Sequence, residues 1–263
     1  MLRYRLRPLA AAVRGQRHVQ DGTPCQDAAT IHVFSRGEAA VWVSDGTGSA
    51  RWAEEGSHLA VNVAAPVISK EFDAYWANPA LAIQPVLDSI LCAIRNRAQT
   101  MAAQAQDLSC TVLFVHARIT RGGRVRYVAG NLGDGAIMQR NGVKTSVLLG
   151  PLRGEYANAT WSVTSTDAAA RFQITSGELP GSAGFLLATD GALFSLVGER
   201  TGDIAGVVLS LLEDARIRKF KAAQVLLERF VRTKLVPRTH DDCTVGLLQA
   251  RHLGNELPKR LIA

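Results

Sequence analysis

Five aspartates in this chain stand where an apolar run gives way to glycine or a small polar residue. They are Asp27, Asp45, Asp134, Asp190 and Asp241. A carboxylate at the end of a strand can point into a cleft while the strand behind it stays in the core. Several carboxylates that meet in one place repel each other unless cations lie between them. The sequence therefore predicts a carboxylate site for hard divalent metal ions.

Strands and helices must bring these carboxylates together. Residues 28–34 and 39–44 are apolar and predict a strand pair joined at Gly37. Apolar residues recur at helical spacing from 53 to 72 and from 80 to 106, with Asn78-Pro79 as the break between two helices. Three strands are then expected in succession, at 110–119, 124–131 and 134–140.

The second half of the chain predicts a longer irregular stretch and then a return to regular structure. Residues 145–183 are rich in Gly, Ser, Thr and Pro, and we expect a flap-like segment there. A strand at 185–189 should carry Asp190, two helices should lie between 205 and 235, and a strand at 244–248 should close the fold. We expect one domain over residues 1–250 and a tail at 251–263.

Composition and charge limit the function classes. The chain has 263 residues, 47% of them hydrophobic and 20% charged, which suits a soluble globular protein. The net charge of +7 could favour nucleic acid or a phosphorylated partner. Arg3, Arg5 and Arg7 alternate as on the solvated face of a strand, and a further basic cluster runs from Arg216 to Lys221. Because no cluster is interleaved with aromatic residues for base stacking, we expect no nucleic-acid partner.

The chain carries no recognisable targeting or membrane segment. The apolar stretch from Leu9 to Val13 is interrupted by Arg14 before it reaches the length of a signal peptide. No run of about 18 apolar residues follows, so we expect no membrane span. The expected location is the cytoplasm.

Six short motifs, which begin at Cys25, Asp45, Ser109, Gly133, Thr189 and Asp241, contain or accompany the aspartates. Their order resembles that in the type 2C metal-dependent protein phosphatases, the PPM family, and among them the small stand-alone bacterial members. The resemblance runs from about Gly15 to Leu248. It implies an α+β fold, a four-layer αββα sandwich of two facing antiparallel sheets with helix pairs outside. The matching motifs are Cys25-Gln26-Asp27-Ala28, Asp45-Gly46-Thr47-Gly48, Ser109-Cys110-Thr111, Gly133-Asp134-Gly135, Thr189-Asp190-Gly191 and Asp241-Asp242-Cys243-Thr244.

The resemblance also implies a role for each ligand. Asp45 would bridge two metal ions, and the Gly46 carbonyl would bind one of them. Asp190 and Asp241 would hold the other ion, and Asp27 would act through a bound water. Asp134 corresponds to a ligand of a third, weaker ion. Ligands that are all oxygen favour Mn²⁺ or Mg²⁺.

The activity implied is hydrolysis of phosphoserine or phosphothreonine in proteins, with Asp45, Asp190 and Asp241 at the catalytic centre. Two ions about 3.5–4 Å apart would activate a shared water for in-line attack on phosphorus. The implied partners are a phosphorylated protein substrate and a serine/threonine kinase that acts on the same targets. Two alternatives stay open: a pseudophosphatase that binds phosphoproteins without turnover, and a phosphatase for small molecules.

One departure from the family pattern concerns the substrate phosphate. Better-known members carry an Arg five residues before the Asp of the first motif, but Gly22 occupies that position here. Our hypothesis is that His18, with Arg14 or Arg17, binds the phosphate instead. The alternative is that His18 only holds its own loop. Glu155 and Asn158 could belong to a flap that meets substrate or metal, or to an ordinary loop.

Overall fold

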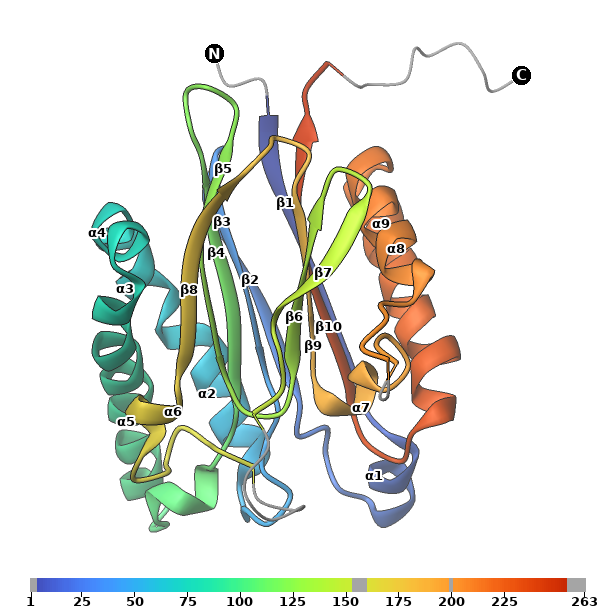
Figure 1. Ribbon diagram of the computed structural model, residues 1–263. Coiled ribbons are helices and arrows are strands. Elements are labelled where there is room, and N and C mark those ends of the chain that lie inside the picture. The colour runs from blue at the N-terminus through green and yellow to red at the C-terminus, as the bar shows by residue number, and fades with distance from the viewer. Residues whose placement is uncertain (1–3, 153–159, 199–200, 255–263) are drawn as a thin grey trace.

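Two five-stranded antiparallel sheets face each other in this protein (Figure 1). The computed structural model describes residues 4–152, 160–198 and 201–254. One sheet has the order β1-β10-β9-β6-β7 and the other has the order β2-β3-β4-β5-β8. The strands are β1 (Tyr4–Val13), β2 (Ala28–Ser35), β3 (Glu38–Ser44), β4 (Val112–Ile119), β5 (Val125–Leu132), β6 (Ala136–Asn141), β7 (Lys144–Leu149), β8 (Gln173–Leu179), β9 (Gly184–Ala188) and β10 (Cys243–His252).

Helices cover the outer face of each sheet, so the predicted four-layer sandwich is confirmed (Figure 1). The group beside the β2–β8 sheet consists of α2 (Ala53–Val63), α3 (Ala65–Lys70), α4 (Phe72–Ala77) and α5 (Ile83–Thr100). The pair beside the β1–β7 sheet consists of α8 (Gly206–Ile217) and α9 (Phe220–Phe230). The short helices are α1 (Gln16–Asp21), α6 (Ala168–Arg171) and α7 (Asp190–Leu193).

Strand β3 shows why the layers hold together. Its side chains point alternately into the core beneath the helices and into the core between the two sheets. Trp42 points to the helices and stacks on Phe114 with ring centroids 4.3 Å apart, while Val41 and Val43 lie in the core between the sheets. A strand buried on both faces needs apolar residues at successive positions, which explains the continuous apolar run of this segment.

The first predicted helix is interrupted, which the hydrophobic pattern did not indicate. Residues 53–72 form α2, α3 and the start of α4 instead of one helix. Pro66 lies in the first turn of α3, where its missing amide is tolerated, but it could not continue a helix from α2. The hairpin predicted at 28–34 and 39–44 is confirmed, with Ala28 paired to Ser44.

The turn from β5 to β6 crosses from one sheet to the other. These strands were expected to follow one another, and they do, but they lie in different sheets. Gly133 makes the turn with φ +135°. A Cβ at this position would lie 2.6 Å from the side chain of Thr111, so only glycine fits both the conformation and the space.

The segment 145–183, expected to be irregular, contains β7, α6 and β8 among its described residues. β8 is an edge strand whose residues are mostly half-buried, so its sequence lacks the apolar run of a central strand. Glu155 and Asn158 lie outside the described residues. β10 continues to His252, beyond the predicted strand end and two residues into the segment expected to be the tail.

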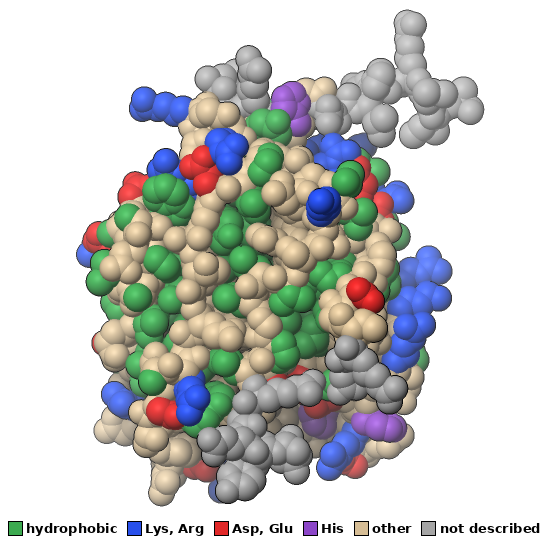
Figure 2. Space-filling model, viewed as in Figure 1, with side chains coloured by type: hydrophobic (Ala, Val, Ile, Leu, Met, Phe, Trp, Pro, Cys, Tyr) green, Lys and Arg blue, Asp and Glu red, His purple; other side chains and the backbone are tan. Residues whose placement is uncertain are grey.

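The basic residues are arranged differently from the sequence expectation. Arg7 is buried, not solvated, and its guanidinium donates hydrogen bonds to the carbonyls of Ala215 and Arg218 at the end of α8. Other Lys and Arg side chains gather along the edge formed by α8 and α9 (Figure 2).

Among the described residues, none of the helices combines the length and hydrophobicity needed to cross a membrane.

Candidate metal centre

A cavity of about 680 Å³ opens at one end of the sandwich, and five of the six predicted ligands line it: Asp45, Gly46, Asp134, Asp190 and Asp241. Asp45 follows β3 of one sheet, whereas Asp190 follows β9 and Asp241 precedes β10 of the other sheet. Asp134 lies in the turn that crosses between the sheets. Strand ends from both sheets therefore bring together carboxylates that are up to 196 positions apart in the sequence, from Asp45 to Asp241.

One group of carboxylates consists of Asp45, Asp134 and Asp190. One carboxylate oxygen from each of them lies within 4.8 Å of the others. Asp241 belongs to a second group, with His18 and Asp242. One possible ligand atom from each of these three residues also lies within 4.8 Å of the others. Asp134, expected to serve a third ion, lies in one group with Asp45 and Asp190. Which ion each residue holds stays a prediction.

Backbone hydrogen bonds fix Asp45 at the end of its strand. Its amide donates to Oγ1 of Thr111 at 2.9 Å, and the Thr111 amide donates to its carbonyl at 2.7 Å. The amide of Gly46 donates to the carbonyl of Gln26 at 3.1 Å. These bonds hold the chain in place without using the Asp45 carboxylate, which remains free to face the cavity.

Asp134 has one satisfied and one unsatisfied oxygen. Thr160 donates its hydroxyl to Oδ2 of Asp134 at 2.7 Å. Oδ1 is buried and has no hydrogen-bond partner among the described residues. A buried carboxylate oxygen without a partner is costly, and a cation would satisfy it. Sequence reasoning missed Thr160 because nothing in its irregular segment distinguishes this threonine from its neighbours.

Asp190 and Asp27 are held by their own local partners. Asp190 begins α7, and its Oδ1 accepts a hydrogen bond from the Gly191 amide at 2.6 Å. Asp27 is only 3% exposed, and its Oδ2 accepts a hydrogen bond from the Thr189 hydroxyl at 2.8 Å. Asp27 is not one of the residues that line the cavity. Its predicted indirect role, through water, is compatible with this buried position.

The pKa values of Asp27, Asp45 and Asp190 are all raised above the ordinary value of an aspartate. Burial raises the pKa of Asp45 well above its ordinary value, and the charges of Asp27, Asp190 and Asp134 raise it further. Burial, with the charges of Asp134 and Asp241, raises the pKa of Asp190 to about 7. Burial also raises the pKa of Asp27 to about 8. The donor set and this repulsion fit divalent cations with oxygen ligands.

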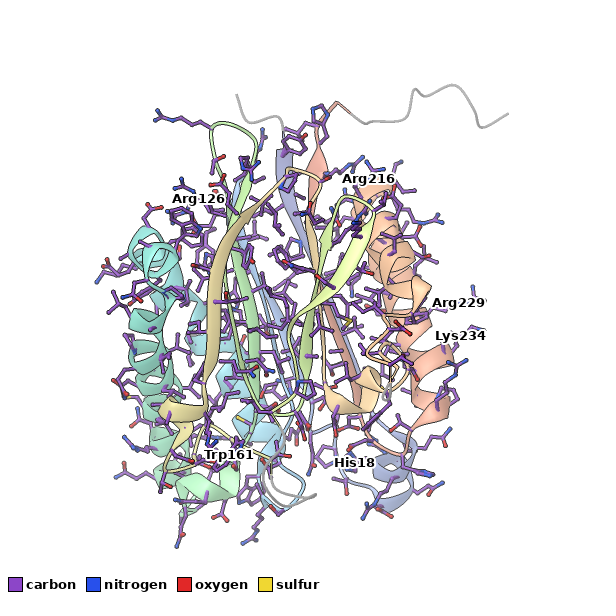
Figure 3. All side chains as sticks on the ribbon, viewed as in Figure 1. His18, Arg126, Trp161, Arg216, Arg229 and Lys234 are labelled. Atoms are coloured by element: carbon purple, nitrogen blue, oxygen red, sulfur yellow. The ribbon has the colours of Figure 1, made fainter. Side chains whose placement is uncertain are left out.

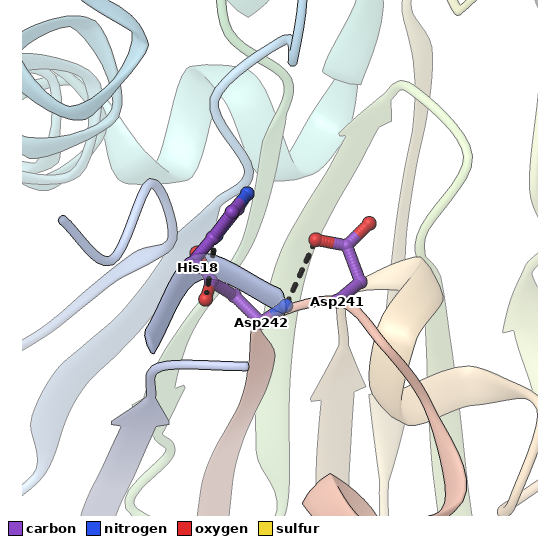
Figure 4. Close-up of side chains that lie close together, drawn as sticks. All are labelled: His18, Asp241 and Asp242. Carbon is purple, nitrogen blue, oxygen red and sulfur yellow. Dashed lines mark hydrogen bonds and ion pairs between the residues drawn. The ribbon is translucent and has the colours of Figure 1, made fainter. Parts of the chain in front are cut away.

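Asp242 organises the other wall of the cavity. It is 2% exposed, and its two oxygens accept hydrogen bonds from the amides of Gly15 and Gln26, each at 2.6 Å. Its own amide donates to Oδ1 of Asp241 at 2.8 Å. His18 lies at the end of the sandwich that holds the cavity (Figure 3). Its Nδ1 lies 3.0 Å from Oδ1 of Asp242 (Figure 4).

The hypothesis that His18 binds the substrate phosphate stays a prediction, but the structure places the residue beside the carboxylates. It lines the cavity from α1, and Figure 4 shows its ring extending from the carboxylate of Asp242 with the second nitrogen pointing away from it. Arg17 also lines the cavity, but it is paired with Asp21 at 3.6 Å. Arg14 is not part of the lining. His18 is the best placed of the three residues proposed to replace the missing Arg.

Comparison with known proteins agrees with this arrangement. The sequence model of the family described as Protein phosphatase 2C matches residues 14–228. The chain belongs to the protein phosphatase 2C family. It is 30% identical to serine/threonine-protein phosphatase 3 of Escherichia coli (strain K12) over 173 residues, which is 62% of this chain and 64% of that relative. The chain thus matches less than two thirds of that relative's length.

Solved structures share the protein phosphatase 2C fold at low sequence identity. The catalytic domain of the serine/threonine protein phosphatase PstP, in complex with two manganese ions, has a TM-score of 0.59 and 16% identity, with 94% of this chain and 99% of that chain covered. RsbX in complex with magnesium has a TM-score of 0.57 and 14% identity, with 94% and 96% covered. At this level of identity the likeness shows the fold.

Proposed function

We propose that the protein is a Mn²⁺- or Mg²⁺-dependent hydrolase that removes phosphate from phosphoserine or phosphothreonine of proteins. The observation that carries this proposal is the group of Asp45, Asp134 and Asp190, whose oxygens lie within 4.8 Å of one another at the end of a protein phosphatase 2C sandwich. The manganese in the PstP structure and the magnesium in the RsbX structure support ions of this kind.

Different residues would bind the metal ions and the substrate phosphate. Asp45, Asp190, Asp241 and the Gly46 carbonyl would hold two ions, with Asp27 acting through water, and Asp134 would hold a further ion. Such ions, when bound, lower the pKa of water and offset the charge on the phosphoryl oxygens. His18, whose Nδ1 lies beside Asp242, would donate a hydrogen bond from the N–H of Nε2 to a phosphoryl oxygen in the cavity.

A substrate of this class implies partners. The phosphate would be carried by a serine or threonine of another protein, and a serine/threonine kinase that acts on the same protein would oppose this hydrolase. Residues outside the carboxylate group would select the substrate protein, because metal ligands determine the type of reaction and not the substrate.

Phosphate release from a phosphoserine peptide and from para-nitrophenyl phosphate tests the proposal, with Mn²⁺, with Mg²⁺ and with chelator. We expect turnover of the peptide that requires metal, and a loss of at least about 100-fold in kcat for Asp45→Asn. Asp88→Asn is the matched control, because Asp88 is exposed on α5. Binding of phosphopeptide without turnover would favour the pseudophosphatase, and turnover of the small ester alone would favour a small-molecule phosphatase.

A further inference from the structure

The net charge of this protein comes from one short segment. Of the 30 Lys and Arg residues, eight lie within residues 216–240, and of the 23 Asp and Glu residues only Glu228 lies there. The remaining residues therefore hold 22 basic and 22 acidic side chains and are balanced in charge. The value of +7 is a property of the segment that contains α9, not of the surface as a whole.

The fold turns the basic side of this segment to solvent. Ala223, Leu227 and Val231 recur every four residues and are buried in the core beneath β1 and β10. Lys221 and Arg229, eight residues apart, share the opposite face and are exposed. Figure 3 shows Arg229 and Lys234 projecting outward on the same side, and Figure 2 shows basic side chains gathered along this edge.

Most of these charges have no acidic partner. Arg216 and Arg218 are paired with Glu213 and Asp214. The other exposed basic residues from α9 onward make no ion pair with any residue that the structure describes. We call five of them the basic strip: Lys221, Arg229, Arg232, Lys234 and Arg238.

The basic strip ends at the rim of the cavity. A π-helical turn (Val231–Leu235) and a 3₁₀ turn (Val236–Arg238) continue α9, and Thr239, His240 and Asp241 follow directly and line the cavity. The amide of Arg17, another residue of the lining, donates to the carbonyl of His240 at 3.2 Å. The chain thus passes directly from the last residue of the strip, Arg238, to residues that line the cavity.

We propose that the basic strip docks an acidic segment of the phosphoprotein substrate while the phosphorylated residue occupies the cavity, an inference that rests on the proposed function. Unpaired positive charges leading to a site for an anionic group would attract and orient an acidic polypeptide. From Lys221 to Arg238 the strip spans roughly 25 Å at the rise of an α-helix. An extended peptide of about eight residues covers that length.

The chemistry of the strip favours a polypeptide over other anionic partners. An interfacial membrane helix needs a continuous apolar face for the lipid, but Ala223 and Leu227 of α9 are packed in the core, and Phe220 and Val225 are its two exposed large apolar side chains. Binding of single-stranded nucleic acid uses a series of aromatic side chains for stacking, and Phe220 is the one exposed aromatic side chain of α9. Glu228 is the one acidic residue among residues 216–240, and Gln224 donates a hydrogen bond to it.

Charge reversal tests the proposal. The variant combines Arg229→Glu, Arg232→Glu and Lys234→Glu. The matched control combines Arg36→Glu, Arg121→Glu and Lys144→Glu, which are exposed positions on other elements with the same total change in charge. The substrates are phosphoserine peptides with eight acidic residues on the N-terminal or the C-terminal side, a peptide with neutral flanks, and para-nitrophenyl phosphate.

We expect the unaltered protein to prefer an acidic peptide, and its advantage to shrink as salt rises. The charge-reversed variant should lose at least about 10-fold in kcat/KM on that peptide, keep its activity on para-nitrophenyl phosphate and retain its circular dichroism spectrum. The control variant should keep the preference. Equal losses on all substrates, or an unchanged preference in the charge-reversed variant, would overturn the proposal.

Direct binding separates this proposal from the proposed function. Fluorescence anisotropy of the unphosphorylated acidic peptide needs no turnover. Binding that the charge reversal abolishes, in a protein without phosphatase activity, would leave the strip as an acidic docking surface and refute the hydrolase. Preferential binding of duplex DNA or of phosphatidylserine vesicles, with none of the peptide, would refute the docking of an acidic polypeptide.

Discussion

At the scale of single residues, Asp242 links two loops beside the cavity. It accepts hydrogen bonds from the amides of Gly15 and Gln26, and its Oδ1 lies 3.0 Å from Nδ1 of His18. Nδ1 of His18 has no hydrogen-bond partner among the described residues. The position of His18 is compatible both with binding of the substrate phosphate and with a structural role in its loop.

The His18→Ala substitution distinguishes the two roles. A hydrogen bond to a charged phosphoryl group contributes about 1.5–3 kcal/mol, so we expect kcat/KM for phosphopeptide to fall by about 10-fold or more. The affinity for Mn²⁺ should change little, because Asp242 keeps its bonds to Gly15 and Gln26. The measurements are steady-state kinetics and calorimetric titration with the metal.

The matched variant is His18→Gln, which retains a hydrogen-bond donor and should recover part of the lost activity. If His18→Ala lowers only the midpoint of thermal unfolding and leaves kinetics unchanged, His18 serves its loop and not the substrate.

At the scale of elements, the turn between β5 and β6 links the two sheets and carries a ligand. Gly133 adopts φ +135°, and the space that a Cβ would need is taken by Thr111, whose hydroxyl and amide also bond to Asp45. A change in this turn would therefore act on Asp45 and Asp134 together.

Gly133→Ala tests that coupling. We expect a loss of about 1–3 kcal/mol in the free energy of unfolding, because alanine is strained in this conformation and its methyl group displaces Thr111. Metal affinity should also fall, by up to about 100-fold. Urea unfolding and metal titration are the measurements, and Gly142→Ala is the control: it has φ +66° but open space and no link to the centre.

The same turn shows how far sequence reasoning reaches. Strong apolar runs predicted most strands, and the resemblance of the motifs around Asp45, Asp190 and Asp241 to a known family predicted the fold. All of the predicted aspartates except Asp27 line the cavity. The crossing at Gly133 could not be predicted, because a tight turn has the same local signal whether it joins two strands of one sheet or of two. The burial of Arg7 and the hydrogen bond from Thr160 depend on distant elements and leave no local pattern.

At the scale of the whole molecule, a buried polar network joins the β2–β8 sheet to its helices. Burial alone would raise the pKa of Glu38, but hydrogen bonds from His116, Ser69 and Arg118 outweigh it and lower the pKa to about 2. Burial lowers the pKa of His116 itself, although Glu38 opposes this effect, and Arg118 and His32 add to the lowering. The folded protein thus holds Glu38 charged and His116 neutral.

This network predicts a loss of stability in acid. Below about pH 6.5, His116 is protonated in the unfolded chain but stays neutral in the folded chain. The free energy of unfolding therefore falls as the pH drops from 6.5 towards the lowered pKa of His116. Stability contributed by Glu38 is present above its unfolded pKa near 4.5 and is lost as the pH falls towards 2. One proton corresponds to a slope of at most about 1.4 kcal/mol per pH unit.

Urea unfolding between pH 5 and 8 measures the effect of His116. His116→Gln should flatten the dependence on pH, whereas His58→Gln, at an exposed position on α2, should not. The aspartates of the cavity titrate in all three proteins, so the difference between them isolates His116. Parallel curves for His116→Gln and the unaltered protein would contradict the prediction.

The carboxylates come from both sheets, and this has a consequence beyond chemistry. Asp45 follows a strand of the β2–β8 sheet and Asp190 follows a strand of the β1–β7 sheet, so an ion that both residues bind would link the two halves of the sandwich. Without it, burial and mutual repulsion raise the pKa of both carboxyl groups. Metal supply would then govern how long this end of the molecule resists proteolysis, separately from its effect on turnover.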